Sequence, residues 1–372
     1  MTSELTAQGM TSIDGSVLGP SIPTGADAPG DDGAPRGDVA PGGEVSPERG
    51  RRRRIALLLL LLAATAALLT IGGWYLLNRK PISELPVPGI TVEAVPHYSL
   101  SIYDVVAPTG VAVNADGSRI YATQTEGDPQ VVVFDGSGSV VGSLKAPATA
   151  GGTHVPVYVA VNPTNGDVYV SDRPAATIYI YSADGAYLRA FDPGPDLTGW
   201  APLGLAFDTK GDLFVTSVGA PFQAVHEFGP DGTFVRTFGK ANDFSFPNGV
   251  AVDASGNVYV ADSNNGRLVV FSRDGSQLGV IGRGAGAGNL GLPRGTAIDD
   301  SGRVYVADLS LQGVQVYHVL AAGEARPQNI GAFGEGGSGD GGFKLPNAVA
   351  VDGRSRVYVA DWRNNRIQVW TY

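Results

Sequence analysis

Hydrophobic residues alternate with turn residues along residues 246–282, FPNGVAVDASGNVYVADSNNGRLVVFSRDGSQLGVIG. The pattern predicts four short strands of five or six residues, GVAVD, NVYVAD, RLVVFS and QLGVIG. The segments ASG, SNNG and RDG between them contain the Gly, Asn and Asp residues that favour tight hairpin turns. A single four-stranded meander cannot bury both of its faces. The pattern therefore indicates that such units stack on one another.

The same unit recurs six times in the C-terminal three quarters of the chain. Each unit begins at a Pro, at Pro108, Pro156, Pro202, Pro247, Pro293 and Pro346. The first strand of each unit ends at an Asn or Asp, at Asn114, Asn162, Asp208, Asp253, Asp299 and Asp352. Successive Pro residues are 45 to 53 residues apart, a period typical of β-propeller blades. The predicted fold class is all-β, a six-bladed β-propeller of four-stranded antiparallel blades.

The units resemble NHL repeats. The resemblance rests on the motifs P-x-G-V-A-V-D, G-x-V-Y-V-A-D and N-N-R-I-Q-V, the last of which stands at residues 364–369. It covers about residues 98–372 and is strongest in units four to six. The first and third units lack the Asp that ends the second strand in the other units, and Thr123 and Ser217 stand in its place. Propellers of this kind carry many unrelated functions, so the resemblance implies a fold and assigns no activity.

The chain ends at IQVWTY, the third strand of the sixth unit, so that unit lacks an outer strand. We expect residues 98–105 (YSLSIYDV) to supply it, which would join the first and last blades and leave no open edge. The alternative is that this segment packs loosely beneath the propeller.

The N-terminal quarter divides into three segments of different composition. Residues 1–50 are rich in Gly, Pro, Asp and Ser without periodicity, which predicts a disordered tail, either inert or used for interaction or phosphorylation at Ser46. Residues 55–77 contain no charged residue and are long enough for a transmembrane helix. Residues 78–96 form a Pro-rich linker, and residues 97–372 form the propeller domain.

The charges that flank the apolar segment predict its orientation. Arg49 and Arg51–Arg54 precede it and only Arg79 and Lys80 follow, which predicts a cytoplasmic N-terminus and an extracytoplasmic propeller. The expected localisation is that of a single-pass membrane protein. A signal peptide cleaved near residues 64–66 (ATA) is the alternative.

Composition narrows the possible functions. The chain has no Cys, which excludes disulfides, thiolate metal sites and Cys nucleophiles. The excess of Arg over Lys, with abundant Ala and Gly, indicates a bacterial genome rich in GC. Residues 95–372 carry a net charge of −8, so this domain lacks the basic patch expected of a protein that binds nucleic acid.

The residues after the repeated Pro should surround one mouth of the central channel. They are Thr109, Val157, Leu203, Asn248, Arg294 and Asn347. Large residues in neighbouring loops of the same face are His154, Arg173, Trp200, Phe222, Phe246, Trp362 and Arg363. Aromatic residues and Arg are enriched at binding hot spots. We predict a ligand-binding site formed by Thr109, His154, Arg173, Trp200, Asn248, Arg294, Asn347 and Trp362; the alternative is a water-filled mouth.

Catalysis is not expected. One Asp per blade at the end of the second strand, at Asp172, Asp262, Asp308 and Asp361, is typical of a turn-stabilising residue. Asp253 and Asp274 likewise mark hairpin turns and lack the pattern of a calcium loop. His226 and His318 fall in third strands, so three inward His residues cannot form the zinc site of amidating lyases, which this repeat also resembles. We expect no metal and no cofactor.

The sequence thus predicts a membrane-anchored binding module that recognises a protein, peptide or envelope ligand on the propeller face. A metal-dependent lyase or lactonase at the channel mouth is the alternative, and a scaffold that uses the sides of the blades is a third possibility.

Overall fold

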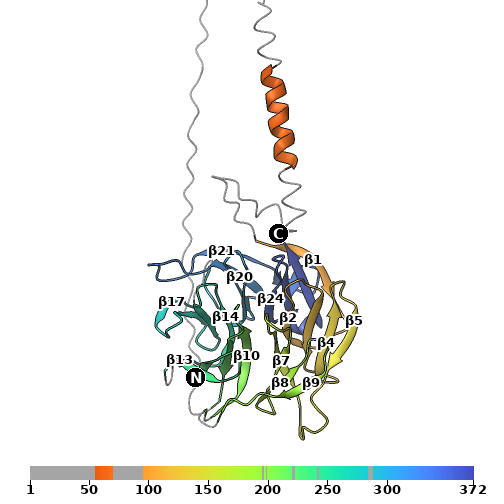
Figure 1. Ribbon diagram of the computed structural model, residues 1–372, viewed down its shortest axis with the longest axis vertical. Helices are drawn as coiled ribbons and strands as arrows, with labels where there is room; N and C mark the ends of the chain where they lie inside the picture. Colours follow the sequence, from red (N-terminus) through yellow and green to blue (C-terminus); the bar gives the residue numbers. More distant parts are fainter. Residues whose placement is uncertain are drawn as a thin grey trace, which may run out of the picture. The chain divides into compact units, whose positions relative to one another are not determined.

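The computed structural model describes residues 55–69, 95–194, 197, 199–219, 223–240, 243–283 and 288–372 (Figure 1). The expected tail, residues 70–77 of the expected span, most of the linker and Phe222 lie outside the described residues. The described propeller consists of short strands joined by turns. Short strands form because runs of Val and aromatic residues end at Gly, Asn or Asp, which adopt the backbone angles that turns require.

Six four-stranded antiparallel sheets form the six blades, which confirms the predicted fold. The first blade contains β2 (Pro108–Val113), β3 (Arg119–Gln124), β4 (Gln130–Asp135) and β5 (Val140–Leu144). The second contains β6 (Pro156–Val161), β7 (Val168–Asp172), β8 (Thr177–Tyr181) and β9 (Tyr187–Ala190). The third contains β10 (Pro202–Phe207), β11 (Leu213–Ser217), β12 (Ala224–Phe228) and β13 (Phe234–Phe238).

The other three blades follow the same plan. The fourth contains β14 (Pro247–Val252), β15 (Val258–Asp262), β16 (Arg267–Phe271) and β17 (Gln277–Ile281). The fifth contains β18 (Pro293–Ile298), β19 (Arg303–Asp308), β20 (Gly313–His318) and β21 (Asn329–Phe333). The sixth contains β24 (Pro346–Val351), β25 (Val357–Asp361), β26 (Arg366–Thr371) and the distant β1 (His97–Ile102). A short parallel pair, β22 (Glu335–Gly336) and β23 (Gly342–Phe343), precedes β24.

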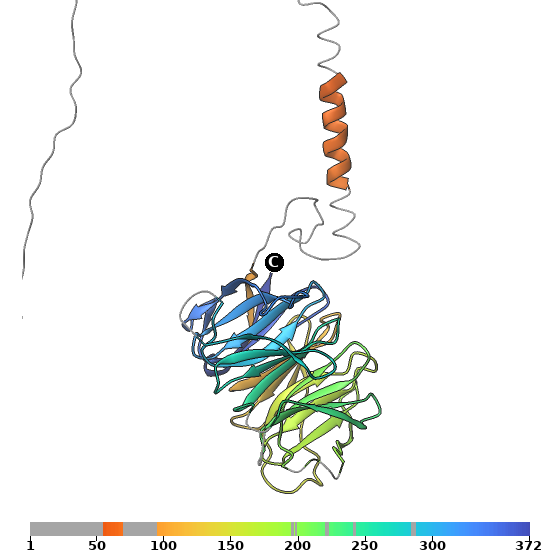
Figure 2. The ribbon, with the colours of Figure 1, turned by 90° about the vertical axis from the view of Figure 1, so that its left-hand side faces the viewer.

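The first and last segments of the propeller close the ring, as the sequence predicted. β1 pairs antiparallel with β26 from His97–Thr371 to Ile102–Ile367 (Figure 2). The strand begins one residue earlier and ends three residues earlier than expected, because Tyr103 to Val105 continue beyond the pairing. Tyr98 strengthens the joint, since its ring packs edge-on against Trp370 at 5.9 Å.

The first strand of every blade has the same irregularity at its start. The Pro pairs with the end of the second strand, but the residue that follows it has no partner in the ladder. Such a bulge redirects one side chain away from the regular alternation. Because the first strands of neighbouring blades surround the axis, these six residues are placed around one mouth of the channel.

Close approach of the inner strands explains the Gly in the P-x-G motif. A Cβ on Gly204 would lie 2.0 Å from the carbonyl oxygen of Asn248 in the next blade, and one on Gly295 would lie 2.5 Å from the Cα of Ala348. The second blade departs from the motif, because Tyr158 stands at this position.

The Asp residues at the ends of second strands stabilise turns, as predicted. Asp308 is fully buried and accepts backbone N–H groups from Gly291, Leu292, Ser310 and Leu311. In the first blade, Gln124 occupies the equivalent position opposite Pro108, so the assignment of Thr123 to it was wrong by one residue. Its side-chain oxygen accepts the Val106 N–H at 3.0 Å, as the Asp carboxylates do elsewhere.

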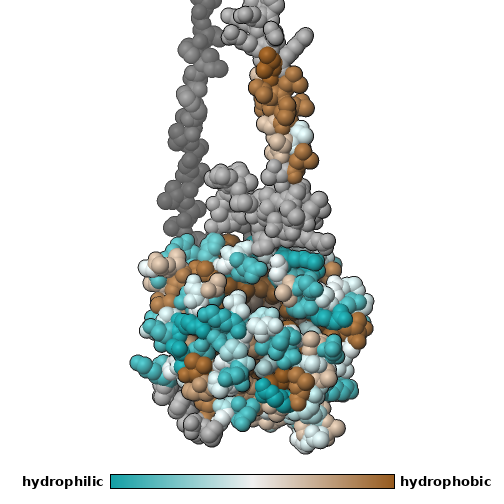
Figure 3. Space-filling view, viewed as in Figure 1, coloured by the Kyte–Doolittle hydropathy of each residue, from teal (hydrophilic) through white to brown (hydrophobic). Residues whose placement is uncertain are grey.

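Residues 55–69 form an α-helix whose apolar side chains are exposed (Figure 3). Among the described residues, no helix is both long and apolar enough to cross a membrane. The described helix covers the first 15 positions of the expected transmembrane helix over residues 55–77, and residues 70–77 lie outside the described residues.

Candidate functional site

A cavity of about 590 Å³ opens at the channel mouth where the inner strands begin. All six residues that follow the repeated Pro line it, which confirms the expected ring. Of the eight predicted site residues, the cavity brings together Thr109, Arg173, Asn248, Arg294, Asn347 and Trp362. We call this cavity and its lining the arginine mouth.

The aromatic ring of Phe246 lies within cation–π distance of two Arg side chains at the arginine mouth. The guanidinium carbon of Arg173 is 5.2 Å from the ring centroid, and that of Arg294 is 5.8 Å from it. Both distances are typical of cation–π interactions. Phe246 has a φ of 58°, a left-handed conformation that costs an L-residue about 1–2 kcal/mol. Its backbone N–H donates to the side-chain oxygen of Gln223, and its carbonyl accepts from Ser263 at 3.3 Å.

Neither Arg at this mouth has a carboxylate partner among the described residues. Several other Arg residues of the propeller pair with a carboxylate, for example Arg366 with Asp361 at 2.9 Å and Arg356 with Asp352 at 2.7 Å. Burial lowers the pKa of Arg294 below its usual range, and the nearby positive charge of Arg173 lowers it further. A guanidinium nonetheless remains protonated in proteins, so the arginine mouth carries two positive charges.

The base of the arginine mouth is held by a hydrogen-bonded set of residues from four blades. The Tyr158 hydroxyl donates to Asn248 Oδ1 at 2.5 Å and lies 3.5 Å from the Asn347 carbonyl. Asn347 Nδ2 donates to the Thr109 carbonyl at 2.6 Å, and Thr109 Oγ1 donates to the Val157 carbonyl at 3.0 Å. Burial strongly raises the pKa of Tyr158, so its hydroxyl stays protonated and acts as a donor.

Two buried N–H groups at this mouth have no acceptor within the part of the chain that the structure describes. They are Nε of Arg294 and Nε1 of Trp362. Buried donors in native proteins are almost always hydrogen-bonded, so an unpartnered one requires an explanation.

Two predicted site residues do not line the cavity. His154 Nδ1 lies 3.0 Å from Asp172 Oδ2, and its Nε2 lies 3.3 Å from the Ala150 carbonyl, so its imidazole supports the turn at the end of β7. Trp200 stacks on Phe191 at 6.3 Å and packs edge-on against Phe228 at 5.8 Å. His154 is held by polar contacts and Trp200 by ring packing. The position of a residue in a loop sequence does not reveal such contacts.

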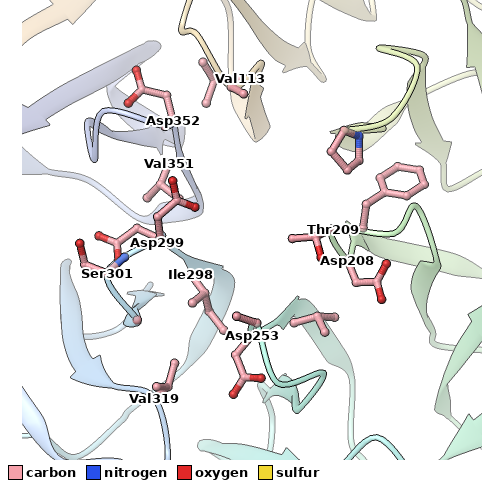
Figure 4. A pocket seen from close by; sticks show the side chains of 18 of the residues that line it. Val113, Asp208, Thr209, Asp253, Ile298, Asp299, Ser301, Val319, Val351 and Asp352 are labelled. Carbon is pink, nitrogen blue, oxygen red and sulfur yellow. The ribbon is translucent and has the colours of Figure 1, made fainter. Parts of the chain in front are cut away.

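The opposite mouth of the channel is lined by the ends of the inner strands and contains a cavity of about 620 Å³ (Figure 4). Its carboxylates are Asp208, Asp253, Asp299, Asp300 and Asp352. We call it the aspartate mouth.

Four of these carboxylates serve the turns that follow the inner strands. Asp352 illustrates the pattern: Oδ1 accepts the N–H groups of Arg354 and Arg356, and Oδ2 accepts Arg356 Nε and the Tyr358 hydroxyl. Asp208, Asp253 and Asp299 each accept two backbone N–H groups in the same way. These four carboxylates therefore already accept hydrogen bonds from the protein itself.

The His residues do not converge at either mouth. His226 lies in β12 and His318 in β20, both third strands. Burial lowers the pKa of His226 to about 4, so this side chain is neutral at pH 7. In the described ranges, no group of three His, Cys, Asp or Glu residues is placed to hold a metal ion.

Sequence reasoning missed the central role of Tyr158. Its signal was present, because the second unit reads P-V-Y where four others read P-x-G. A large residue at the point where inner strands approach each other must direct its side chain into the channel. Phe246 was noted only as one aromatic among several, since nothing local indicates that two Arg from other blades contact its ring.

Comparison with known proteins supports the repeat assignment. Residues 244–271 and 343–370 match the NHL repeat. The chain is 29% identical over 231 residues to human NHL repeat-containing protein 3 and 30% identical over 229 residues to the mouse protein of that name. Each match covers 57% of this chain and 50% of the relative, so the chain spans about half the length of the curated relatives it matches.

Two solved structures share the fold at low sequence identity. A streptogramin B lyase structure has a TM-score of 0.51 at 15% identity and covers 74% of this chain and 96% of its own. The structure of U3-55K has a TM-score of 0.55 at 12% identity and covers 75% of this chain and 100% of its own. At these identities the likeness concerns the propeller fold alone. The chain thus contains NHL repeats and folds as a six-bladed β-propeller.

Proposed function

We propose that this protein is a binding module whose arginine mouth recognises a segment of a protein or peptide. The observation that carries the proposal is that Arg173 and Arg294 both contact the Phe246 ring, in a cavity that also contains Trp362. Aromatic residues and Arg dominate the binding energy of protein interfaces because they combine large apolar area with directional polar groups.

The lining favours binding over chemistry. Its polar side chains are Thr, Tyr, Asn, Arg and Trp, and none of its described lining residues is a carboxylate, His or Lys. General acid–base catalysis requires a group whose pKa lies near the working pH. The polar groups of the arginine mouth are instead suited to donating hydrogen bonds to a ligand that does not react.

The proposal includes a membrane anchor. The helix over residues 55–69 presents Leu side chains on its surface, and the uncharged sequence continues to residue 77. Together with the preceding Arg residues, this favours a bacterial single-pass protein with a cytoplasmic N-terminus and an extracytoplasmic propeller. Carbonate extraction of membranes should leave the full chain in the pellet, whereas deletion of residues 55–77 should release it. Release of the full chain would contradict the anchor.

Selection from a displayed library of random peptides tests the binding function. We expect peptides selected on the full chain in detergent to lose at least about tenfold in affinity with Phe246→Ala, the loss typical of a hot spot. The matched control is Thr209→Ala, an exposed residue of the aspartate mouth, which should bind the same peptides unchanged. Peptides that bind both variants equally would place the site elsewhere.

A further inference from the structure

The arginine mouth concentrates positive charge in a domain that is otherwise acidic. Residues 95–372 carry a net charge of −8, yet every charged side chain that lines this cavity within the described residues is an Arg. Arg294 is partly buried and makes no hydrogen bond or ion pair with the described residues, although burying a charge without a partner is costly. A bound anion would supply the missing partner.

The N–H donors without acceptors in the same cavity indicate which hydrogen-bond acceptors the anion must have. Arg294 Nε and Trp362 Nε1 are buried without acceptors and come from the fifth and sixth blades. Arg173, from the loop after β7 in the second blade, is exposed and can reach a ligand from another side. A group with two acceptor oxygens in one plane matches such donors, because a guanidinium binds a carboxylate through parallel N–H···O bonds.

The remaining lining favours an anion carried by an apolar group. Val155, Val157 and Leu203 form an apolar wall next to the polar residues. A doubly charged phosphate would be repelled more strongly by the acidic domain and would gain nothing from this wall. We propose that the arginine mouth binds a carboxylate adjacent to an apolar side chain, presented by a peptide. This inference rests on the proposed function and assigns its ligand chemistry.

The indole N–H of Trp362 provides a direct readout of the site. In the full chain labelled with ¹⁵N-tryptophan, Trp362→Phe assigns the signal among the four Trp residues. The probes are N-acetyl-leucine, its C-terminal amide, N-acetyl-glutamic acid α-amide and inorganic phosphate, all at matched ionic strength. We expect N-acetyl-leucine to shift the Trp362 signal saturably and the leucine amide to leave it unmoved. The glutamic acid amide has a carboxylate without an adjacent apolar side chain, so we expect it to bind more weakly; equally tight binding would overturn the apolar part of the proposal.

Replacing single Arg residues by Gln distinguishes binding in the cavity from a general effect of the charge of the domain. We expect Arg294→Gln and Arg173→Gln each to weaken N-acetyl-leucine binding about tenfold, the effect of one charge-assisted hydrogen bond. Arg173 is exposed, so its variant tests the inference even if Arg294→Gln fails to fold. The matched control Arg189→Gln removes an exposed charge from β9, outside the cavity, and should bind as the wild type does.

The contrary outcomes are distinct. Equal shifts from N-acetyl-leucine and its amide, or unchanged binding by both cavity variants, would overturn the inference. Phosphate binding as tight as that of N-acetyl-leucine would overturn the choice of carboxylate. If the small-molecule tests fail but displayed peptides still depend on Phe246, the proposed function stands and only its ligand chemistry is wrong. If the peptides do not depend on Phe246 either, the proposed function is wrong as well.

Discussion

The two mouths of one channel use charged residues in opposite ways. At the aspartate mouth, Asp208, Asp253, Asp299 and Asp352 accept hydrogen bonds from the turns that follow the inner strands. At the arginine mouth, Arg173 and Arg294 have no carboxylate partner among the described residues, and buried N–H groups lack acceptors. The larger cavity is therefore the less suited to a ligand, because four of its five carboxylates already accept hydrogen bonds from the protein. Charge alone does not identify a site; unused hydrogen-bonding capacity does.

The largest effect should come from breaking a turn at the aspartate mouth. Asp352→Ala removes the acceptor of two backbone N–H groups, Arg356 Nε and the Tyr358 hydroxyl, all around a buried carboxylate. We expect the free energy of unfolding to fall by about 3 kcal/mol, since a buried ion pair loses one partner. Urea denaturation of the full chain measures it. A variant as stable as the wild type would show that the turn does not depend on this carboxylate.

A smaller effect should follow from altering the base of the arginine mouth. Tyr158→Phe removes the hydrogen bond to Asn248 Oδ1, and we expect a loss of about 1 kcal/mol in the free energy of unfolding. Tyr121→Phe is the control, because the residue is largely buried but its hydroxyl has no hydrogen bond to any described residue. Denaturation curves of the two variants should differ accordingly. Equal losses would mean that the Tyr158 hydroxyl does not hold the four blades together.

The smallest effect on stability should come from a residue that we propose contacts the ligand. Arg173→Gln removes an exposed guanidinium without a carboxylate partner, and we expect the free energy of unfolding to change by less than about 0.5 kcal/mol. Arg366→Gln is the contrasting variant, since Arg366 is buried against Asp361 and its loss should be strongly destabilising. Thermal unfolding distinguishes them. A marked loss in Arg173→Gln would indicate a structural role for that side chain.

Several features of the fold could be predicted because each depends on local pattern repeated six times. The Pro residues, the VYV strands and the turn Asp residues each recur with one period, so a local ambiguity in one unit is resolved by the others. The ring closure by β1 was also predictable, because the last unit lacks a strand. The exception is Gln124, whose place was misassigned to Thr123 because the first unit departs from the motif.

The candidate site was predictable only in part. The position after the repeated Pro is set by a bulge common to all blades, so Thr109, Asn248, Arg294 and Asn347 were placed correctly. Side chains in the longer loops follow no such rule. His154 is held by Asp172 and Trp200 by Phe191 and Phe228, and both are thereby removed from the cavity.

By itself the sequence determined the number of blades, their strand order and the ring of residues at one mouth, because strand periodicity and turn residues act over short distances. Only the tertiary structure decided which charges remain without partners. Whether Arg294 meets a carboxylate, and whether the Phe246 ring contacts two guanidinium groups, depends on residues from blades far apart in the chain. Such contacts carry no local signal, since they arise when the closed ring brings the inner strands to a common axis.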